Sequence, residues 1–442
     1  MAQLKKKLNL YGLTMIAVGV CIGAGIFTAP GQVVEAVPNH LLVILLWLFG
    51  GLVALTGALT FSELGSMFPK AGGVYVYLKE AYGDLVGFLY GWVTLLVINT
   101  GAIAALAFVF AEYVTTFPML AGINKLSLAI GVVIFLTTIN AFGVSVGQLL
   151  ANIFTGFKLL AIAAIIVVGI VYFDPSRVNM DFSLDTAPDN LVQALFVGLI
   201  GVFFSTGGWH HASYVSGEAI NASKTVPRAM VLGVTIVTIT YIFINLVYMM
   251  LLPLPQIATT ETIAGDALGV IFPIGGQIMA FIIAASVFGS ISILTMSAPR
   301  IYMAMAEDGI FFKQLSTIHP KYKTPIVAMF IQATWAILLM VVLPSFRELM
   351  AFVTFMDIFT MTLAGLSIFV FRRTRKDLER PVKVVLYPFV PLIYVLFSGA
   401  FVISTLMVIP ATSWYGLIIL VVGVPLFYYF KKKNLNGGTP IT

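Results

Sequence analysis

Long apolar stretches follow one another along almost the whole chain, separated by short polar or charged segments. Most are about 20 residues long, the length at which a helix crosses a bilayer. A membrane β-barrel would instead show weaker segments in which apolar and polar residues alternate. The pattern therefore predicts an all-α integral membrane protein with twelve transmembrane helices, near residues 10–37, 40–67, 84–115, 126–146, 148–172, 190–215, 228–252, 271–304, 325–343, 346–371, 384–409 and 412–430.

Glycines interrupt two of these predicted helices, the first and the sixth, near their middle. The sequences at the breaks are Gly23-Ala24-Gly25 and Gly207-Gly208. A helix that breaks at mid-membrane exposes N–H and C=O groups, which costs on the order of several kcal/mol unless a polar group fills the gap. Two breaks at matching positions are typical of secondary transporters, in which the gap holds a small zwitterion or an ion.

The breaks divide one transmembrane domain, 1–442, into two similar series of spans. The first repeat covers about 10–172 and the second about 190–371, and two extra helices cover about 384–430. Because each repeat has five spans, an odd number, the second must cross the membrane in the opposite direction. We therefore expect a 5+5 inverted repeat whose broken helices cross at the midplane.

The ends of the broken helices carry unpaired backbone groups of both signs. The half-helix that begins near Ile26 presents N–H groups and a positive dipole end, which suit a carboxylate. The half-helices that end near Cys21 and near Phe204 present carbonyls, which suit an ammonium. A free α-amino acid carries both complementary charges a few ångströms apart.

Composition and charge support a membrane protein and indicate its orientation. The chain is 60% hydrophobic and 10% charged, whereas soluble domains carry roughly 25% charged residues. Most lysines and arginines fall in segments that share one side if both termini are cytoplasmic, as the positive-inside rule requires. The net charge of +6 therefore reflects topology in the cell membrane and contact with membrane lipid, not a nucleic-acid partner.

Few residues in the predicted spans have chemistry of their own. Lys158 and Asp357 are ionisable groups inside spans five and ten, so each should face the protein interior and have partners. His210 follows the second break directly and is a candidate for the side-chain pocket. Cys21 is the only cysteine, so a disulfide within the chain and a cysteine-based metal cluster are both excluded. We expect no metal, no cofactor and no enzyme, because no catalytic motif is found, and we do not favour a channel, because the breaks would occlude a pore.

Several motifs together resemble a known family. The stretches in question are Ile22-Gly23-Ala24-Gly25-Ile26-Phe27, Pro69-Lys70-Ala71-Gly72-Gly73-Val74-Tyr75, Phe204-Ser205-Thr206-Gly207-Gly208-Trp209, Glu218-Ala219-Ile220-Asn221 and Ser297-Ala298-Pro299-Arg300. They resemble the amino acid–polyamine–organocation superfamily, and within it the L-type amino acid transporter family. The motifs also resemble those of bacterial serine/threonine and alanine-serine-cysteine exchangers. The resemblance implies a LeuT-like fold.

The resemblance also implies roles for individual residues. The substrate carboxylate would lie on the backbone amides of Ala24, Gly25 and Ile26, and the ammonium would face the carbonyls of Cys21, Phe204 and Gly207. The complete set of expected substrate-binding residues is Cys21, Gly23, Ala24, Gly25, Ile26, Phe204, Ser205, Thr206, Gly207 and His210. Phe204 would close over the substrate as an aromatic gate. For Asp357 the expectation comes from its place inside span ten and not from the resemblance: it would relay a proton in gating or coupling, or form a static hydrogen bond with a polar neighbour. Lys158 would stand where sodium-coupled relatives bind the ion, tethered to carbonyls such as that of Gly23.

By this resemblance the chain exchanges small neutral L-amino acids by alternating access, independently of sodium. Two alternatives stay open. A proton-coupled symporter would use Lys158 or Asp357 as its titrating group. A cationic amino acid or polyamine carrier would need an acid near the substrate side chain, and neither break contains one. No disulfide-linked heavy chain is expected, since no cysteine lies in an outer loop.

Overall fold

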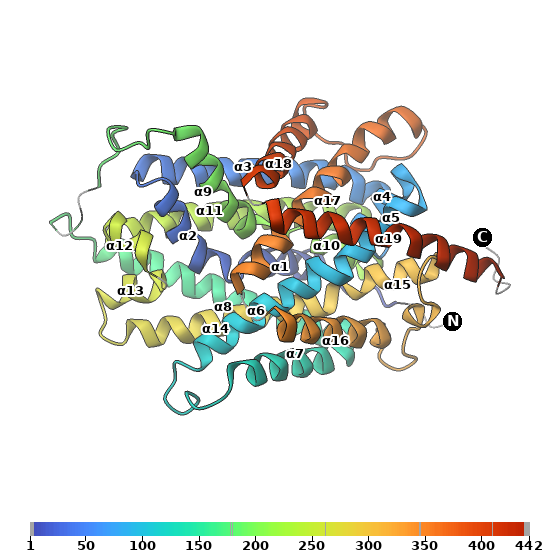
Figure 1. Ribbon diagram of the computed structural model, residues 1–442, viewed down its shortest axis with the longest axis horizontal. Coiled ribbons are helices and arrows are strands. Elements are labelled where there is room, and N and C mark those ends of the chain that lie inside the picture. The colour runs from blue at the N-terminus through green and yellow to red at the C-terminus, as the bar shows by residue number, and fades with distance from the viewer. Residues whose placement is uncertain are drawn as a thin grey trace.

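The computed structural model describes residues 4–176, 178, 180–260, 262–343, 346–408 and 410–436. In Figure 1 the longer helices run roughly side by side, and both marked ends of the chain lie at the same end of the bundle. The helices α12 and α13 lie at the opposite end.

Helices account for nearly all regular structure in the described residues. In chain order they are α1 (Leu10–Cys21), α2 (Gly25–Ala36), α3 (His40–Met67), α4 (Val74–Tyr82), α5 (Asp84–Val93), the π-helix η1 (Thr94–Ile98), α6 (Asn99–Val114), α7 (Lys125–Ala141), α8 (Val144–Val171), α9 (Leu191–Thr206), α10 (His211–Tyr214), the 3₁₀-helix η2 (Ser216–Glu218), α11 (Ala222–Leu251), α12 (Leu254–Thr259), α13 (Ile263–Gly269), α14 (Gly275–Ser297), α15 (Pro299–Glu307), the 3₁₀-helix η3 (Lys313–Ser316), α16 (Ile326–Val342), α17 (Phe346–Thr374), α18 (Phe389–Val408) and α19 (Pro410–Asn436).

The predicted all-helical membrane fold is confirmed in its coarse form. Within the described part of the chain, nine helices are long and apolar enough to cross a membrane, and the bent pair α1 and α2 makes ten. The remaining two predicted spans correspond to α7 and α16, apolar helices of 17 residues each. The protein is therefore a multi-pass membrane protein.

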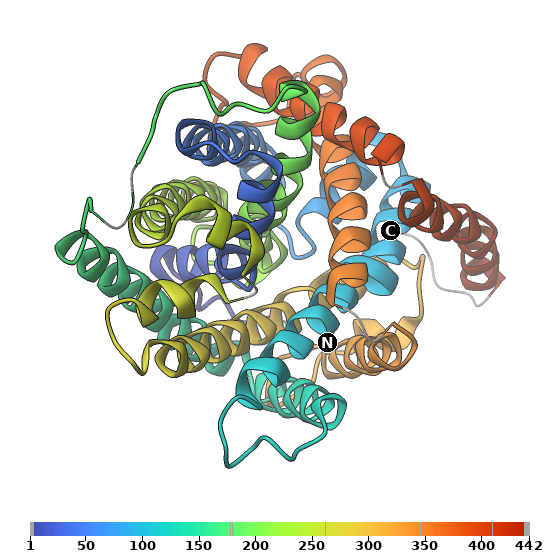
Figure 2. The same cartoon turned by 60° about the vertical axis from the view of Figure 1, so that its left-hand side comes forward.

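The two halves of the chain interleave instead of packing as separate bodies. The helix α3 lies along α11, α2 lies against α9, and α6 packs on α14. Figure 2 shows this mixing, because blue segments lie beside green ones that are distant in sequence. The broken pair α1 and α2 is thereby enclosed, and every side chain from Ile22 to Phe27 is buried.

Several of the sequence motifs meet at the end of the bundle that holds the termini. The carboxylate of Glu218 accepts two hydrogen bonds from Arg300, at 2.9 and 2.8 Å, and both side chains are fully buried. The backbone N–H groups of Lys7 and Leu8 donate to the Glu218 carbonyl at 2.8 and 2.9 Å. Gly73 allows the close approach of the Pro69–Tyr75 motif to α10, because a Cβ there would lie 2.7 Å from the backbone carbon of Ser213.

Candidate functional site

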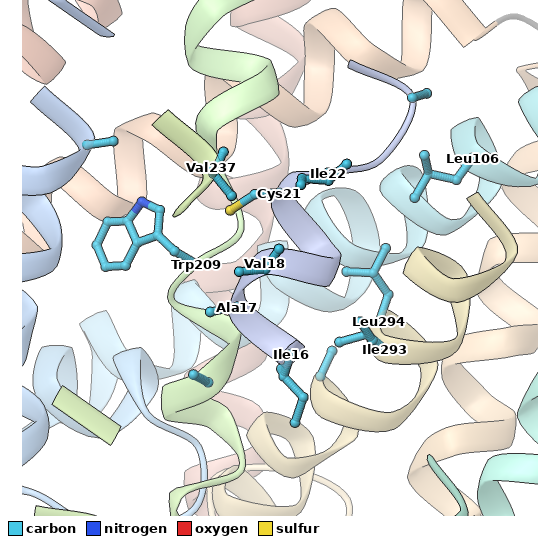
Figure 3. Packing of buried hydrophobic residues seen from close by; sticks show 14 of the residues in the cluster. Ile16, Ala17, Val18, Cys21, Ile22, Leu106, Trp209, Val237, Ile293 and Leu294 are labelled. Carbon is cyan, nitrogen blue, oxygen red and sulfur yellow. The ribbon is translucent and has the colours of Figure 1, made fainter. Parts of the chain in front are cut away.

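The first break separates α1 from α2. The helix α1 ends at Cys21, α2 begins at Gly25, and their axes differ by 43°. Figure 3 shows α1 ending close to Cys21 and Ile22, with the chain continuing as a loop. A Cβ on Gly25 would lie 2.9 Å from the Cα of Ser205, so a glycine is needed for the two breaks to lie this close together. The first N–H groups of α2 have no acceptor inside their own helix, as at any helix start.

The second break separates α9 from the single-turn helix α10. The helix α9 ends at Thr206, two residues later than the predicted end near Phe204. Gly207 is extended, with φ −72° and ψ 162°, and Gly208 has a φ of +104°, a conformation open to glycine at little cost. This pair of conformations turns the chain out of the helix before His211 starts α10.

A tyrosine that sequence reasoning missed joins the two breaks. The hydroxyl of Tyr241, on α11, lies 2.7 Å from the Cys21 carbonyl and 3.0 Å from the Ser205 carbonyl. The Cys21 carbonyl also accepts the N–H of Gly23 at 2.9 Å. A carbonyl has two lone pairs, so that of Cys21 is fully used. The expected contact of this carbonyl with a substrate ammonium therefore has a competitor inside the protein.

Lys158 lies behind the first break, not in the cavity between the breaks. Its ammonium donates to the carbonyls of Gly19 at 3.0 Å and Ile22 at 2.6 Å, and to the Oγ of Ser290 at 3.0 Å. The expected carbonyl partner was that of Gly23, one residue further along. An ammonium has three donors, and all three are satisfied here. The charge also lies at the carbonyl end of α1, where the helix dipole favours a cation.

A cavity of about 150 Å³ lies between the breaks. Cavities of this volume hold a molecule as large as benzene, so a small amino acid matches it in size. The residues that line it come from the two breaks and from α3, α6, α14, α17 and α18: Val20, Cys21, Gly23, Ala24, Gly25, Val53, Ala54, Ile98, Asn99, Ala102, Ala105, Leu106, Phe203, Phe204, Thr206, Gly207, Gly208, Trp209, His210, His211, Leu294, Val353, Thr354, Asp357, Ile358, Met361, Tyr394 and Ser398.

The structure brings most of the predicted site residues to this cavity. Its lining includes Cys21, Gly23, Ala24, Gly25, Phe204, Thr206, Gly207, His210 and Asp357. The two remaining members of the expected binding set, Ile26 and Ser205, are buried beside the cavity without lining it. Ser205 instead packs against Gly25 and donates its hydroxyl hydrogen bond to the Gly201 carbonyl at 2.8 Å.

Three side chains that line the cavity carry buried polar atoms without hydrogen-bond partners among the described residues. The Nε2 of His210 lies 3.8 Å from the Oδ1 of Asp357, and neither atom has a hydrogen-bond partner among the described residues. Both polar atoms of the Asn99 amide are also unpartnered. Neither break contains an acid in its own sequence, as the sequence analysis stated, but Asp357 lines the same cavity. Asp357 is distant in sequence, and only the packing of α17 brings it to the second break.

The other histidine of the sixth span has a different environment. The Nδ1 of His211 lies 2.8 Å from the Oγ of Ser297, so its ring is tied to α14. Asn99 could have been noticed as a polar residue inside an apolar span. It directly follows the π-helix η1, a local irregularity common at functional sites that the sequence pattern did not reveal.

Helices that cross a membrane around a cavity bounded by two broken helices define a membrane carrier. A family model described as "Amino acid permease" matches residues 8–427, and the chain belongs to this family. It is similar to the serine/threonine exchanger SteT of Bacillus subtilis, with 33% identity over 98% of both chains. It is also similar to human large neutral amino acids transporter small subunit 2, at 33% identity over 97% of this chain and 82% of the relative. Human b(0,+)-type amino acid transporter 1 is 31% identical over 97% and 88% of the two chains.

Proposed function

We propose that this protein exchanges small neutral L-amino acids across the cell membrane by alternating access, without sodium. The observation that carries this proposal is the cavity between the two breaks, which is small and bounded by the N-terminal end of α2. The names of the relatives, a serine/threonine exchanger and a large neutral amino acid transporter subunit, support the substrate class.

The substrate carboxylate would bind the N–H groups of Ala24, Gly25 and Ile26 at the start of α2. These groups offer an anion site in which backbone donors and the helix dipole act together. Ile26 contributes through its main chain, so its buried side chain is compatible with this role. Phe204 lines the same cavity and would close over the bound substrate.

Lys158 would replace a sodium ion as the fixed positive charge that holds the first break. Its three contacts tie α8 and α14 to the last carbonyls of α1. A charge that is covalently part of the protein does not depend on external sodium. Exchange would therefore proceed at the same rate in sodium and in choline buffer.

The topology that we propose has twelve spans, with both termini cytoplasmic and with the first ten spans forming an inverted repeat. Counterpart helices of the two repeats pack on one another, as the pairs α3 and α11, α6 and α14, and α7 and α16 do. Cys21 is buried and is the only cysteine, so a disulfide to a second subunit has no accessible partner. We propose that the chain works without a disulfide-linked heavy chain.

Reconstituted proteoliposomes test the proposal. Labelled serine or alanine should enter vesicles preloaded with either amino acid and should enter empty vesicles far more slowly, with or without a sodium gradient. Competition by each of the twenty amino acids then defines selectivity. Stimulation by sodium would contradict the role of Lys158, and absence of any amino acid flux would contradict the function itself.

Proton-coupled symport is the second candidate, and the unpartnered pair of His210 and Asp357 is the observation that favours it. A symporter would fill empty vesicles and acidify their lumen as substrate enters. An exchanger would do neither. A pH-sensitive dye inside the vesicles separates the two.

A further inference from the structure

Several backbone carbonyls at the breaks already have hydrogen-bond partners inside the protein. The Cys21 carbonyl is saturated by Tyr241 and Gly23. The Gly19 and Ile22 carbonyls both accept from Lys158. At the second break, the Ser205 carbonyl lies 3.0 Å from the same Tyr241 hydroxyl, whose single hydrogen it can only share with Cys21, and the Thr206 carbonyl lies 3.8 Å from the Cys21 thiol. An ammonium carries three donors and a full charge, so a carboxylate beside these carbonyls would complete its set of acceptors.

The carboxylate of Asp357 lies beside the second break. The side chain of Asp357 lines the cavity and is 20% exposed. Its Oδ2 is 3.9 Å from where a Cβ on Gly207 would lie, so it reaches the second break. Its Oδ1 has no hydrogen-bond partner among the described residues. The Nε2 of His210, at 3.8 Å, is beyond hydrogen-bond distance.

We propose that Asp357 binds the α-ammonium of the substrate, as the anionic half of a site whose cationic half is the start of α2. This inference rests on the proposed function. A carboxylate in a low-dielectric site needs a positive partner, and the substrate ammonium supplies it. Gly25 packs on Ser205, and Asp357 lies beside Gly207, two residues further along. The two halves are therefore close enough to be bridged by a molecule whose own charges are a few ångströms apart.

The assignment has a consequence for specificity and for motion. Every α-amino acid has the same ammonium, so Asp357 would serve all substrates equally, and Asn99 and His210 would be left to contact side chains. Because Asp357 belongs to α17, a bound substrate would join α17 to the start of α2. An empty cavity would leave the carboxylate unpaired, which favours exchange over return of the empty carrier.

Binding of alanine, serine and L-lactate to purified protein tests the assignment. Serine differs from alanine by the side-chain hydroxyl, and L-lactate differs from alanine by a hydroxyl in place of the ammonium. We expect the Asp357→Asn variant to lose about ten- to hundredfold in affinity for alanine and serine alike, the range for a charge-assisted hydrogen bond. Its affinity for L-lactate should be no lower than that of the wild type. Glu112→Gln, which alters an exposed carboxylate, should leave all three affinities unchanged.

Other outcomes overturn the assignment. A loss for serine alone would place Asp357 at the substrate side chain. Unchanged affinities with slower exchange would make it a gating residue only. If Asp357→Asn is not monodisperse after purification, Asp357→Ser gives the same comparison. Wild-type protein that binds neither amino acid would refute the proposed function, whereas wild-type binding with any other pattern in the variant refutes only this inference.

Discussion

The two helix breaks lie side by side at the centre of the protein but are completed in different ways. At the first break, Lys158 and Tyr241 satisfy the carbonyls at the end of α1. At the second, His210 and Asp357 line the cavity and carry buried polar atoms that have no hydrogen-bond partner among the described residues. The polar groups at the first break are thus satisfied mainly within the protein. Those at the second break are left for a ligand to satisfy.

This difference explains how one cavity can be both stable and selective. Unsatisfied polar groups cost about 1–3 kcal/mol each when buried, so a protein gains by filling those that the substrate does not need. The polar atoms left open are then the ones that a substrate can satisfy. A ligand that fails to satisfy them is rejected, because they remain unpaired.

Removal of the Lys158 side chain at the first break should have the largest effect, a loss of exchange activity. The Lys158→Ala variant leaves the Gly19 and Ile22 carbonyls and the Ser290 hydroxyl without their shared donor. We expect exchange in proteoliposomes to fall by about a hundredfold or more, since losing even about 3 kcal/mol from the working conformation would have this effect. Uptake of labelled serine into preloaded vesicles measures it.

The control for this variant is Lys125→Ala, which removes an exposed lysine that pairs with Glu112 at the surface. Exposed pairs contribute about 0–1 kcal/mol, so this variant should keep its activity. Full exchange activity in Lys158→Ala would mean that the first break is held without the lysine, and the contrast between the two breaks would disappear.

A single methyl group added at Gly25 should disrupt the close packing of the two breaks. In Gly25→Ala the new Cβ would lie 2.9 Å from the Cα of Ser205, so backbone must move. Overpacking of this kind costs about 1–3 kcal/mol. The matched variant Gly23→Ala meets nothing closer than 3.6 Å. Thermal unfolding in detergent should show a clear drop in Tm for Gly25→Ala and little change for Gly23→Ala. Equal Tm values would show that the contact with Ser205 is not tight.

Sequence patterns predicted the all-helical membrane fold in its coarse form and the position of both breaks. Apolar length located the spans, and glycine pairs marked the interruptions at Gly23 and Gly207, because both signals are local in the chain. The partners of the breaks could not be read in the same way. Tyr241 and Asp357 reach the site from α11 and α17, and only tertiary packing decides which face of a uniformly apolar helix turns inward.

Removal of the Tyr241 hydroxyl, which joins the two breaks, should have an intermediate effect on stability. In Tyr241→Phe the carbonyls of Cys21 and Ser205 lose a donor, which should lower stability by about 1 kcal/mol. Tyr248 lies on the same helix, and its buried hydroxyl has no hydrogen-bond partner among the described residues. Tyr248→Phe should therefore be neutral or slightly stabilising. Thermal unfolding of both variants compares them, and an equal loss in both would indicate packing instead of hydrogen bonding.

We expect the smallest effect on stability from a substitution of Cys21, whose thiol is the other contact between the two breaks. Its Sγ lies 3.8 Å from the Thr206 carbonyl, and a thiol is a weak donor. The Cys21→Ser substitution keeps the shape of the side chain and places a stronger hydrogen-bond donor near the Thr206 carbonyl. A hydrogen bond to this carbonyl would compensate for the burial of the new hydroxyl. We expect a change in stability within about 0.5 kcal/mol and an unchanged affinity for alanine. A loss as large as that of Tyr241→Phe would mean that the thiol contributes as much as the tyrosine hydroxyl to holding the two breaks together.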